Sequence, residues 1–279
     1  MSEPKKSNPL EEIEKAAHPL DKLEKLMKAL RDPQHGCPWD LKQNFKTIAP
    51  YTIEEAYEVA DAIDKNDMEN LREELGDLLF QSVYHAQMAS ELGIFTLTDV
   101  INDITNKMIY RHPHVFANDG ADNEEDVRLI WEQRKAAEKS TAQAAEAPSA
   151  LDGIPLNLPA LMRAQKIQKK AAKANFEWKN AHHILDKLEE EITELREAID
   201  NETIEEQKDE LGDLLFVLAN FARNLNIDAE ESVRSANAKF ERRFKGMEID
   251  AKLSGKEFKD HSHDEMKQLW IKQKHKEAK

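Results

Sequence analysis

The stretch Glu210-Leu211-Gly212-Asp213-Leu214-Leu215-Phe216 has an identical copy, Glu74-Leu75-Gly76-Asp77-Leu78-Leu79-Phe80, earlier in the chain. Each copy places a Glu three residues before an Asp and then continues into apolar residues. Residues 55–80 align with residues 191–216 without a gap. Seven identical residues in a row are hard to obtain by chance, so the chain contains an internal duplication, and the duplicated part is acidic.

A second acidic pair precedes each copy at the same distance: Glu55 and Glu58 in the first, Glu191 and Glu194 in the second. Residues three apart on a helix share a face, so four carboxylates would converge in each copy if the two helices are antiparallel neighbours. Such like charges are unfavourable unless a cation lies between them. Because no Cys or His belongs to the pattern, it favours Mg²⁺ or Mn²⁺ over structural zinc.

The acidic pairs have two other interpretations. Glutamates on exposed helix faces usually carry no chemistry, but the duplication at identical spacing argues against that here. A di-iron site needs Glu-x-x-His pairs, and no His of this chain lies three residues after a Glu.

The composition predicts a helical protein that does not bind nucleic acid. Charged residues make up 34% and aromatics 6% of the chain, with only 8 Gly and 10 Pro, which favours long amphipathic helices. The net charge of −15 disfavours a nucleic-acid backbone as partner. The single cysteine, Cys37, fits a reducing compartment, and no apolar run approaches the ~20 residues that span a bilayer. We therefore expect a cytoplasmic protein with no membrane partner.

The predicted fold class is all-α, with two tandem helical bundles. We expect a flexible leader over 1–15, a first domain over 16–137, a linker rich in Ala, Ser, Thr and Pro over 138–159, and a second domain over 160–279. The first acidic helix is expected to follow a break over 48–52, with Thr52 as its cap. The last helix of the second domain is expected over 229–244, followed by a tail.

Paired cations follow both acidic motifs. Lys239 and Arg243 lie four residues apart, as do Lys107 and Arg111, so each pair shares a helix face. A single pair of this kind is usually solvated, but its recurrence favours phosphate binding. Lys187, one turn before Glu191, is a further candidate.

Aromatic residues near these cations have two interpretations. Trp131 and Trp270 correspond at nearly the same offset as the acidic motifs, and either could stack on a base or pack at the end of a bundle. His112 and His114 flank Pro113, where a structural role is favoured over metal binding.

The chain resembles the MazG nucleoside triphosphate pyrophosphohydrolases, in the arrangement with two tandem MazG domains. The acidic pattern alone is shared with dimeric dUTPases and phosphoribosyl-ATP pyrophosphohydrolases. The resemblance is therefore carried also by four further segments, which are Gly36-Cys37-Pro38-Trp39-Asp40, 111–116, 161–168 and 239–244.

The resemblance implies an all-α bundle, a homodimer, and hydrolysis of a nucleoside triphosphate to a monophosphate and pyrophosphate. It also implies Mg²⁺ held by four carboxylates in each copy. In the second copy these are Glu191, Glu194, Glu210 and Asp213, and in the first they are Glu55, Glu58, Glu74 and Asp77.

The second copy is expected to be the main catalytic site. It has the richer set of cations, whereas an acidic loop follows the cations of the first copy and would oppose a triphosphate. Glu190 or Glu191 is the candidate for orienting the attacking water. The alternatives left open are a narrower specificity for dUTP or dCTP, and a helical interaction module whose acidic faces bind a basic partner.

Overall fold

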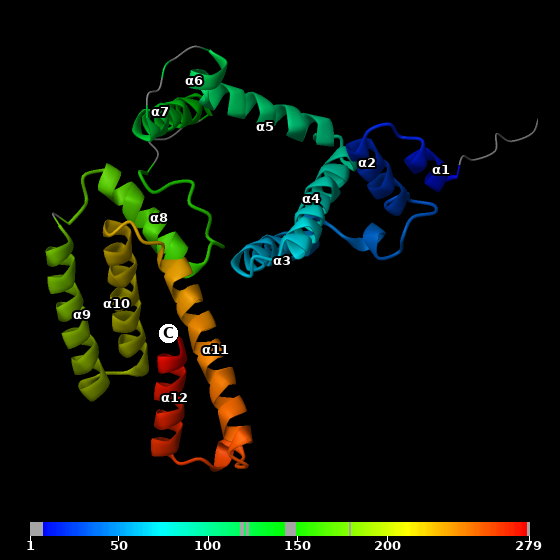
Figure 1. Ribbon diagram of the computed structural model, residues 1–279. Helices are drawn as coiled ribbons and strands as arrows, with labels where there is room; N and C mark the ends of the chain where they lie inside the picture. The colour runs from blue at the N-terminus through cyan, green and yellow to red at the C-terminus, as the bar shows by residue number, and fades with distance from the viewer. Residues whose placement is uncertain (1–7, 118–119, 121–122, 143–148, 179, 278–279) are drawn as a thin grey trace, which may run out of the picture. The chain divides into compact units, whose positions relative to one another are not determined.

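The computed structural model describes residues 8–117, 120, 123–142, 149–178 and 180–277, and all the regular elements in these ranges are helical (Figure 1). The prediction of an all-α fold is confirmed. The chain divides into two compact units, Met1–Ala144 and Ala145–Lys279. Within the described ranges, no helix combines the length and the apolar character needed to cross a membrane.

The first unit is built around two long helices that carry the first acidic motif. Its elements are α1 (Pro9–Glu14), α2 (Pro19–Leu30), the 3-10 turn η1 (Asp40–Lys42), α3 (Phe45–Asp64), α4 (Met68–Glu91), α5 (Leu97–Arg111), α6 (Pro113–Phe116) and α7 (Glu124–Ala142). Helix α3 packs along α4, α2 packs on α4, and α5 contacts α4 and α7.

The second unit repeats the acidic helix pair. Its elements are α8 (Ala160–Lys173), α9 (Ala181–Asn201), α10 (Ile204–Asn224), α11 (Ala229–Leu253), the 3-10 turn η2 (Phe258–Asp260) and α12 (His263–Glu277). Helices α9 and α10 lie side by side, α8 packs on α10, and α12 packs along α11 (Figure 1).

The two acidic helix pairs share their register. Ile48 on α3 and Ile184 on α9 occupy equivalent positions and are 1% and 0% exposed. Ala62 and Ala198 are likewise equivalent, and both are fully buried where each helix meets its neighbour. The same face of each helix is therefore turned inward, which directs the equivalent glutamates toward the neighbouring helix.

Helix α3 begins earlier than predicted. Asn44 caps it by accepting hydrogen bonds from the backbone N–H groups of Lys46 and Thr47, and the Thr47 hydroxyl accepts one from the backbone of Asn44. The predicted break over 48–52 is wrong, because this capping box and the burial of Ile48 offset the backbone hydrogen bond lost at Pro50.

Two stretches predicted to lack regular structure contain helix. Within the expected leader, Asn8 caps α1, Pro9 takes its first position, and α1 packs on α2. Helix α7 extends to Ala142, into the expected linker, and its Glu138 is held by Arg111. Of the remaining linker, 143–148 lies outside the described residues and 149–159 forms turns without a helix.

The end of the second unit is more helical than predicted. Helix α11 continues to Leu253, and the expected tail is helix α12. The Gln273 amide on α12 donates to the Asp250 carboxylate on α11 at 2.6 Å, and Lys272 and Lys276 pair with the same carboxylate. Helix α12 is thus held on α11 by charge and hydrogen bonds, together with the ring contact between Phe240 and Trp270.

Candidate metal centres

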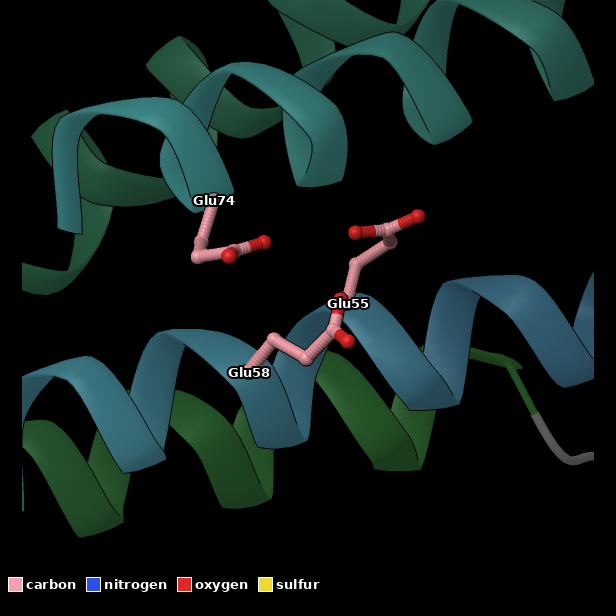
Figure 2. Close-up of side chains that lie close together, drawn as sticks. All are labelled: Glu55, Glu58 and Glu74. Atoms are coloured by element: carbon pink, nitrogen blue, oxygen red, sulfur yellow. The ribbon is translucent and has the colours of Figure 1, made fainter. Parts of the chain in front are cut away.

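Three carboxylates of the first unit converge between α3 and α4. Glu55 and Glu58 project from α3 and Glu74 from α4, as Figure 2 shows. One oxygen of each carboxylate lies within 4.8 Å of the others. We call this set the N-terminal cluster. Helix spacing puts the two α3 glutamates on one face, and the antiparallel neighbour supplies the third.

Burial and mutual repulsion favour the neutral forms of two of these carboxyls. Desolvation and then the charge of Asp77 raise the pKa of Glu55 above its usual value. Desolvation and then the charge of Glu58 raise the pKa of Glu74. A bound divalent cation would reverse this, since it stabilises the ionised form of every carboxylate around it.

The equivalent carboxylates of the second unit also converge. Glu191 and Glu194 on α9 and Glu210 on α10 place ligand oxygens within 4.8 Å of one another, and we call them the C-terminal cluster. Glu191 is only 4% exposed. Desolvation, followed by the charge of Glu194, raises the pKa of Glu210.

A lysine lies inside the C-terminal cluster. The Lys187 ammonium is 2.8 Å from a Glu191 oxygen, 2.7 Å from Glu190 and 4.0 Å from Glu194. Its hydrogen bonds to Glu190 and Glu191 raise the pKa of Lys187. The structure thus places Lys187 and Glu190 together at the cluster, beside the residues predicted to bind metal.

The two predicted aspartate ligands lie nearby but outside the triplets formed by the described residues. Beside desolvation, the charge of Asp77 raises the pKa of Glu55 and the charge of Asp213 raises that of Glu210, so each aspartate lies near one carboxyl of its cluster. Their role as fourth ligands stays a prediction.

The predicted substrate-binding arginines are engaged elsewhere in both units. Arg243 pairs with Glu277 at 2.6 Å and lies over the Trp270 ring at 5.4 Å. In the first unit Arg111 pairs with Glu138 and lies over Trp131 at 5.0 Å. The correspondence of the two tryptophans in the sequence therefore marks a repeated Arg–Glu–Trp contact.

The other candidate residues near these contacts are either exposed lysines or a packed histidine. Lys107 and Lys239 are exposed, one turn before Arg111 and Arg243. The His112 ring packs edge-on against Trp131, and its Nδ1 lies 2.6 Å from the carbonyl of Met108. These contacts agree with a structural role for His112.

A group of polar side chains beside the N-terminal cluster, made by Gln81, Thr52 and His85, was not predicted from the sequence. The Gln81 amide donates to Glu55 at 3.4 Å, and one turn further the Thr52 hydroxyl lies 3.1 Å from His85 Nε2. Desolvation lowers the pKa of His85. The equivalent positions of the second unit hold the apolar side chains Val217, Leu188 and Phe221, which pack together. The signal available in the sequence was the change from Gln to Val between otherwise similar copies.

The fold and the two clusters define a class of protein: an all-α chain with two oxygen-rich sites suited to hard divalent cations. The MazG nucleotide pyrophosphohydrolase domain matches residues 43–116 and 179–247, which include both clusters. The chain belongs to this family, as its resemblance predicted.

Known relatives match almost the whole chain. The nucleoside triphosphate pyrophosphohydrolase of Escherichia coli (strain K12) is 47% identical over 260 residues, covering 92% of this chain and 98% of that protein. The nucleoside triphosphate pyrophosphohydrolase/pyrophosphatase MazG of Thermotoga maritima is 40% identical over 255 residues, covering 91% and 95%. A crystal structure of a mazG-related protein from Thermotoga maritima is 31% identical, covers 42% of this chain and 98% of that chain, and has a TM-score of 0.36.

Membership of this family decides between the two classes of function considered from the sequence. It confirms the prediction of a hydrolytic enzyme, a nucleotide pyrophosphohydrolase, over a helical interaction module.

Proposed function

We propose that this chain hydrolyses nucleoside triphosphates to nucleoside monophosphates and pyrophosphate at its C-terminal cluster, with Mg²⁺ as cofactor and Mn²⁺ able to replace it. The names of its relatives support the reaction. The observation that carries the choice of site is the convergence of three carboxylates around the buried Glu191, with the Lys187 ammonium beside them.

The residues of the C-terminal cluster fit a hard divalent cation. All of its ligand groups are carboxylate oxygens, and desolvation followed by the charge of Glu194 raises the pKa of Glu210, which a bound cation would reverse. Glu191, Glu194, Glu210 and Asp213 would hold the ion. When bound, such an ion supplies positive charge to phosphate oxygens and acidifies water.

The chain's own groups then divide the remaining work. Lys187 already lies among the carboxylates, so its ammonium is placed to hold a phosphate that reaches the cluster. Glu190 lies on the other side of Lys187 and is more exposed than Glu191, which makes it the better placed of the two to orient an attacking water from solvent. Both roles are assigned by position.

The second cationic group belongs to α11 and α12. Lys239, Arg243 and Trp270 would hold the distal part of the substrate, with Trp270 stacking on the base. Because Glu277 neutralises Arg243, a triphosphate would have to compete with Glu277 for that guanidinium. In the first unit Lys107 and Arg111 would have the same role, opposed by Glu138.

The apolar surface of the acidic helices supports a homodimer. Leu75 and Leu79 on α4 are 50% and 44% exposed, and Leu211 and Leu215 on α10 are 47% and 46% exposed. The two leucines of each pair are one helical turn apart and partly exposed, and Leu79 also lines an apolar hollow of its own unit with Leu20 and Leu23 of α2. An exposed apolar stripe of this kind is stabilised when a second copy covers it. We also propose a cytoplasmic location, because the single cysteine fits a reducing compartment.

Removal of Glu194 from the cluster, or of the neighbouring Asp213, should strongly slow the reaction. For Glu194→Ala and Asp213→Ala we expect pyrophosphate release to fall at least ~100-fold, because several kcal/mol of charge stabilisation are lost. The measurement is product analysis after incubation with Mg²⁺ and a panel of ribo- and deoxynucleoside triphosphates, which also tests for a dUTP or dCTP preference. Glu197→Ala, one turn beyond Glu194 on the exposed side of α9, is the matched control. Wild-type rates in both variants would refute the assignment.

A further inference from the structure

The two acidic clusters differ in whether a cation of the chain lies among the carboxylates. In the C-terminal cluster the Lys187 ammonium is 2.8 Å from Glu191. The equivalent position of the first unit is Tyr51, whose ring packs edge-on against Trp39 at 6.2 Å. Within the described ranges, no Lys or Arg pairs with a carboxylate of the N-terminal cluster. The first cluster is therefore left without a counter-ion from the chain.

A buried amide beside the N-terminal cluster has an oxygen atom without a hydrogen-bond partner. Gln81 is 9% exposed, and its Nε2 lies 3.4 Å from a Glu55 oxygen, a long hydrogen bond. Its Oε1 is fully buried and accepts no hydrogen bond. A buried polar atom without a partner is unfavourable, and here it belongs to a side chain that already contacts a carboxylate of the cluster.

Rotation of this amide would turn an unfavourable group into a ligand. If the amide rotates by about 180°, its Oε1 takes the place of Nε2 next to the Glu55 carboxylate. The amide oxygen and the carboxylate oxygen then repel each other unless a cation lies between them. Amide oxygens are ordinary ligands of hard divalent cations, and they add no charge to the site. At the equivalent position the second unit has the buried Val217, which offers no ligand atom.

We propose that the N-terminal cluster, completed by the Gln81 amide oxygen, binds a divalent cation without nucleotide, whereas the C-terminal cluster, whose negative charge Lys187 offsets in part, binds its cation only together with substrate phosphates. The comparison rests on the proposed function of the C-terminal cluster. The chain would then keep one ion bound at all times near the carboxylates drawn in Figure 2. It would bind a second ion, together with the substrate, in each catalytic cycle.

The test is to count Mn²⁺ ions bound to the full chain without nucleotide, from the loss of the free-ion signal in electron paramagnetic resonance. We expect one ion per chain for the wild type and none at the same concentration for Glu55→Gln. Gln81→Val, which installs the residue of the second copy, should weaken this binding about tenfold, as loss of a supporting ligand does. Gln81→Glu should retain the ion, because it restores an oxygen.

Adding or removing the lysine at the equivalent positions tests the other half of the proposal. Tyr51→Lys should weaken Mn²⁺ binding to the N-terminal cluster in the absence of nucleotide. Lys187→Met should allow a second Mn²⁺ per chain to bind without nucleotide. Gln268→Val, an exposed substitution on α12, is the control, and circular dichroism verifies that each variant is folded.

The proposal is overturned if the wild type binds no Mn²⁺ without nucleotide, if Gln81→Val binds as the wild type does, or if Glu191→Gln rather than Glu55→Gln removes the ion. Failure of the proposed function would be seen separately. Absence of pyrophosphate release would leave the Mn²⁺ counts of the Glu55, Gln81 and Tyr51 variants unchanged.

Discussion

At the scale of single residues, Lys187 has two sets of partners available. In the structure its ammonium is shared by Glu190, Glu191 and Glu194, of which Glu191 is buried. Like charges packed this closely need a positive group, and before a cation arrives Lys187 is that group. Because Lys187 is only one helical turn from Glu191 on the same helix, its ammonium stays near the site after the carboxylates bind a cation.

Replacement of Lys187 should weaken the reaction without unfolding the protein. For Lys187→Met we expect kcat/KM for nucleoside triphosphates to fall about 10- to 100-fold, the effect of losing a charged hydrogen bond of roughly 1.5–3 kcal/mol. Steady-state kinetics with saturating Mg²⁺ provide the measurement. Lys245→Met, which removes an exposed lysine paired with Glu241 at 3.6 Å, should leave kcat/KM unchanged. An unchanged value in Lys187→Met would contradict the role given to this residue.

Tyr84 is the polar centre of the first unit's core. It is 2% exposed, and its hydroxyl donates to the Asp40 carboxylate at 2.9 Å and to the Asp40 carbonyl at 3.1 Å. The Arg31 guanidinium lies 5.7 Å from its ring centre and bonds Glu91. Burial, followed by the hydrogen bond to Asp40, raises the pKa of Tyr84 to about 12.

This shift predicts a loss of stability at alkaline pH. The raised pKa means that the folded state retains a proton that the unfolded state loses, so the contribution is full below pH 10 and declines as pH rises toward about 12. Tyr84→Phe should unfold about 1–3 kcal/mol more easily at pH 7 and lack this decline. Urea unfolding from pH 7 to 11 provides the measurement, with Tyr57→Phe, at 46% exposure, as control. A parallel pH dependence in Tyr84→Phe and wild type would exclude Tyr84 as its source.

At the scale of helices, the acid-bearing elements were predictable and their long-range supports were not. The acidic helix pairs follow from local periodicity and from caps that residues close in sequence supply. Helix α12 has a local cap, since the Ser262 hydroxyl accepts from the backbone N–H of Glu265 and the Glu265 carboxylate accepts from that of Ser262. Its place on α11 depends instead on Asp250 and Glu277, whose partners are distant in the sequence. The run of identical residues in the two copies ends at Phe80, and the Gln81 amide beside the N-terminal cluster comes one residue later, where the copies differ.

The contact between α11 and α12 depends on a glycine. A Cβ at Gly246 would lie 2.5 Å from Gln273 Oε1 and 2.8 Å from its Cδ. Since Gln273 is buried and bonds Asp250, it cannot move without losing that hydrogen bond. The glycine therefore allows the close approach of the two helices.

Gly246→Ala should therefore destabilise the wild type by about 1 kcal/mol, the value of a hydrogen bond. In the Gln273→Ala background the sign should reverse, since alanine is favoured over glycine in a helix by about 0.5–1 kcal/mol. Thermal unfolding of the four proteins of this double-mutant cycle provides the measurement. A stabilising Gly246→Ala in both backgrounds would show that the two helices do not approach as closely as this contact requires.

At the scale of the whole molecule, two copies of one helix pair have diverged within a single chain. Their buried faces stayed equivalent, as Ile48 and Ile184 show, and their exposed apolar faces stayed equivalent too, as Leu79 and Leu215 show. The groups around the carboxylates changed instead. A surface kept apolar in both copies is most simply explained by the homodimer proposed above.

A charge placed on that surface should dissociate the dimer. We expect Leu79→Lys and Leu215→Lys to shift the wild-type dimer toward monomer in sedimentation velocity at micromolar concentration, because a lysine buried in an apolar interface loses its hydration. Leu253→Lys, at a position 80% exposed near the end of α11, should remain dimeric. If the wild type is a monomer at this concentration, the proposed homodimer is wrong.

The caps of the acidic helices have a consequence for how the chain tolerates insertions and deletions. Asn44 and Asn180 precede the first cluster glutamate of their helix, Glu55 or Glu191, by the same interval. That interval is about three helical turns, so one added residue would rotate the carboxylate away from its neighbour by about 100°. Beyond the acids the copies did change length, because the interval between the starts of α4 and α5 is longer than that between the starts of α10 and α11. The duplication has thus kept its helical phase from each asparagine cap to the acids, while the connections before and after that stretch differ in length between the copies.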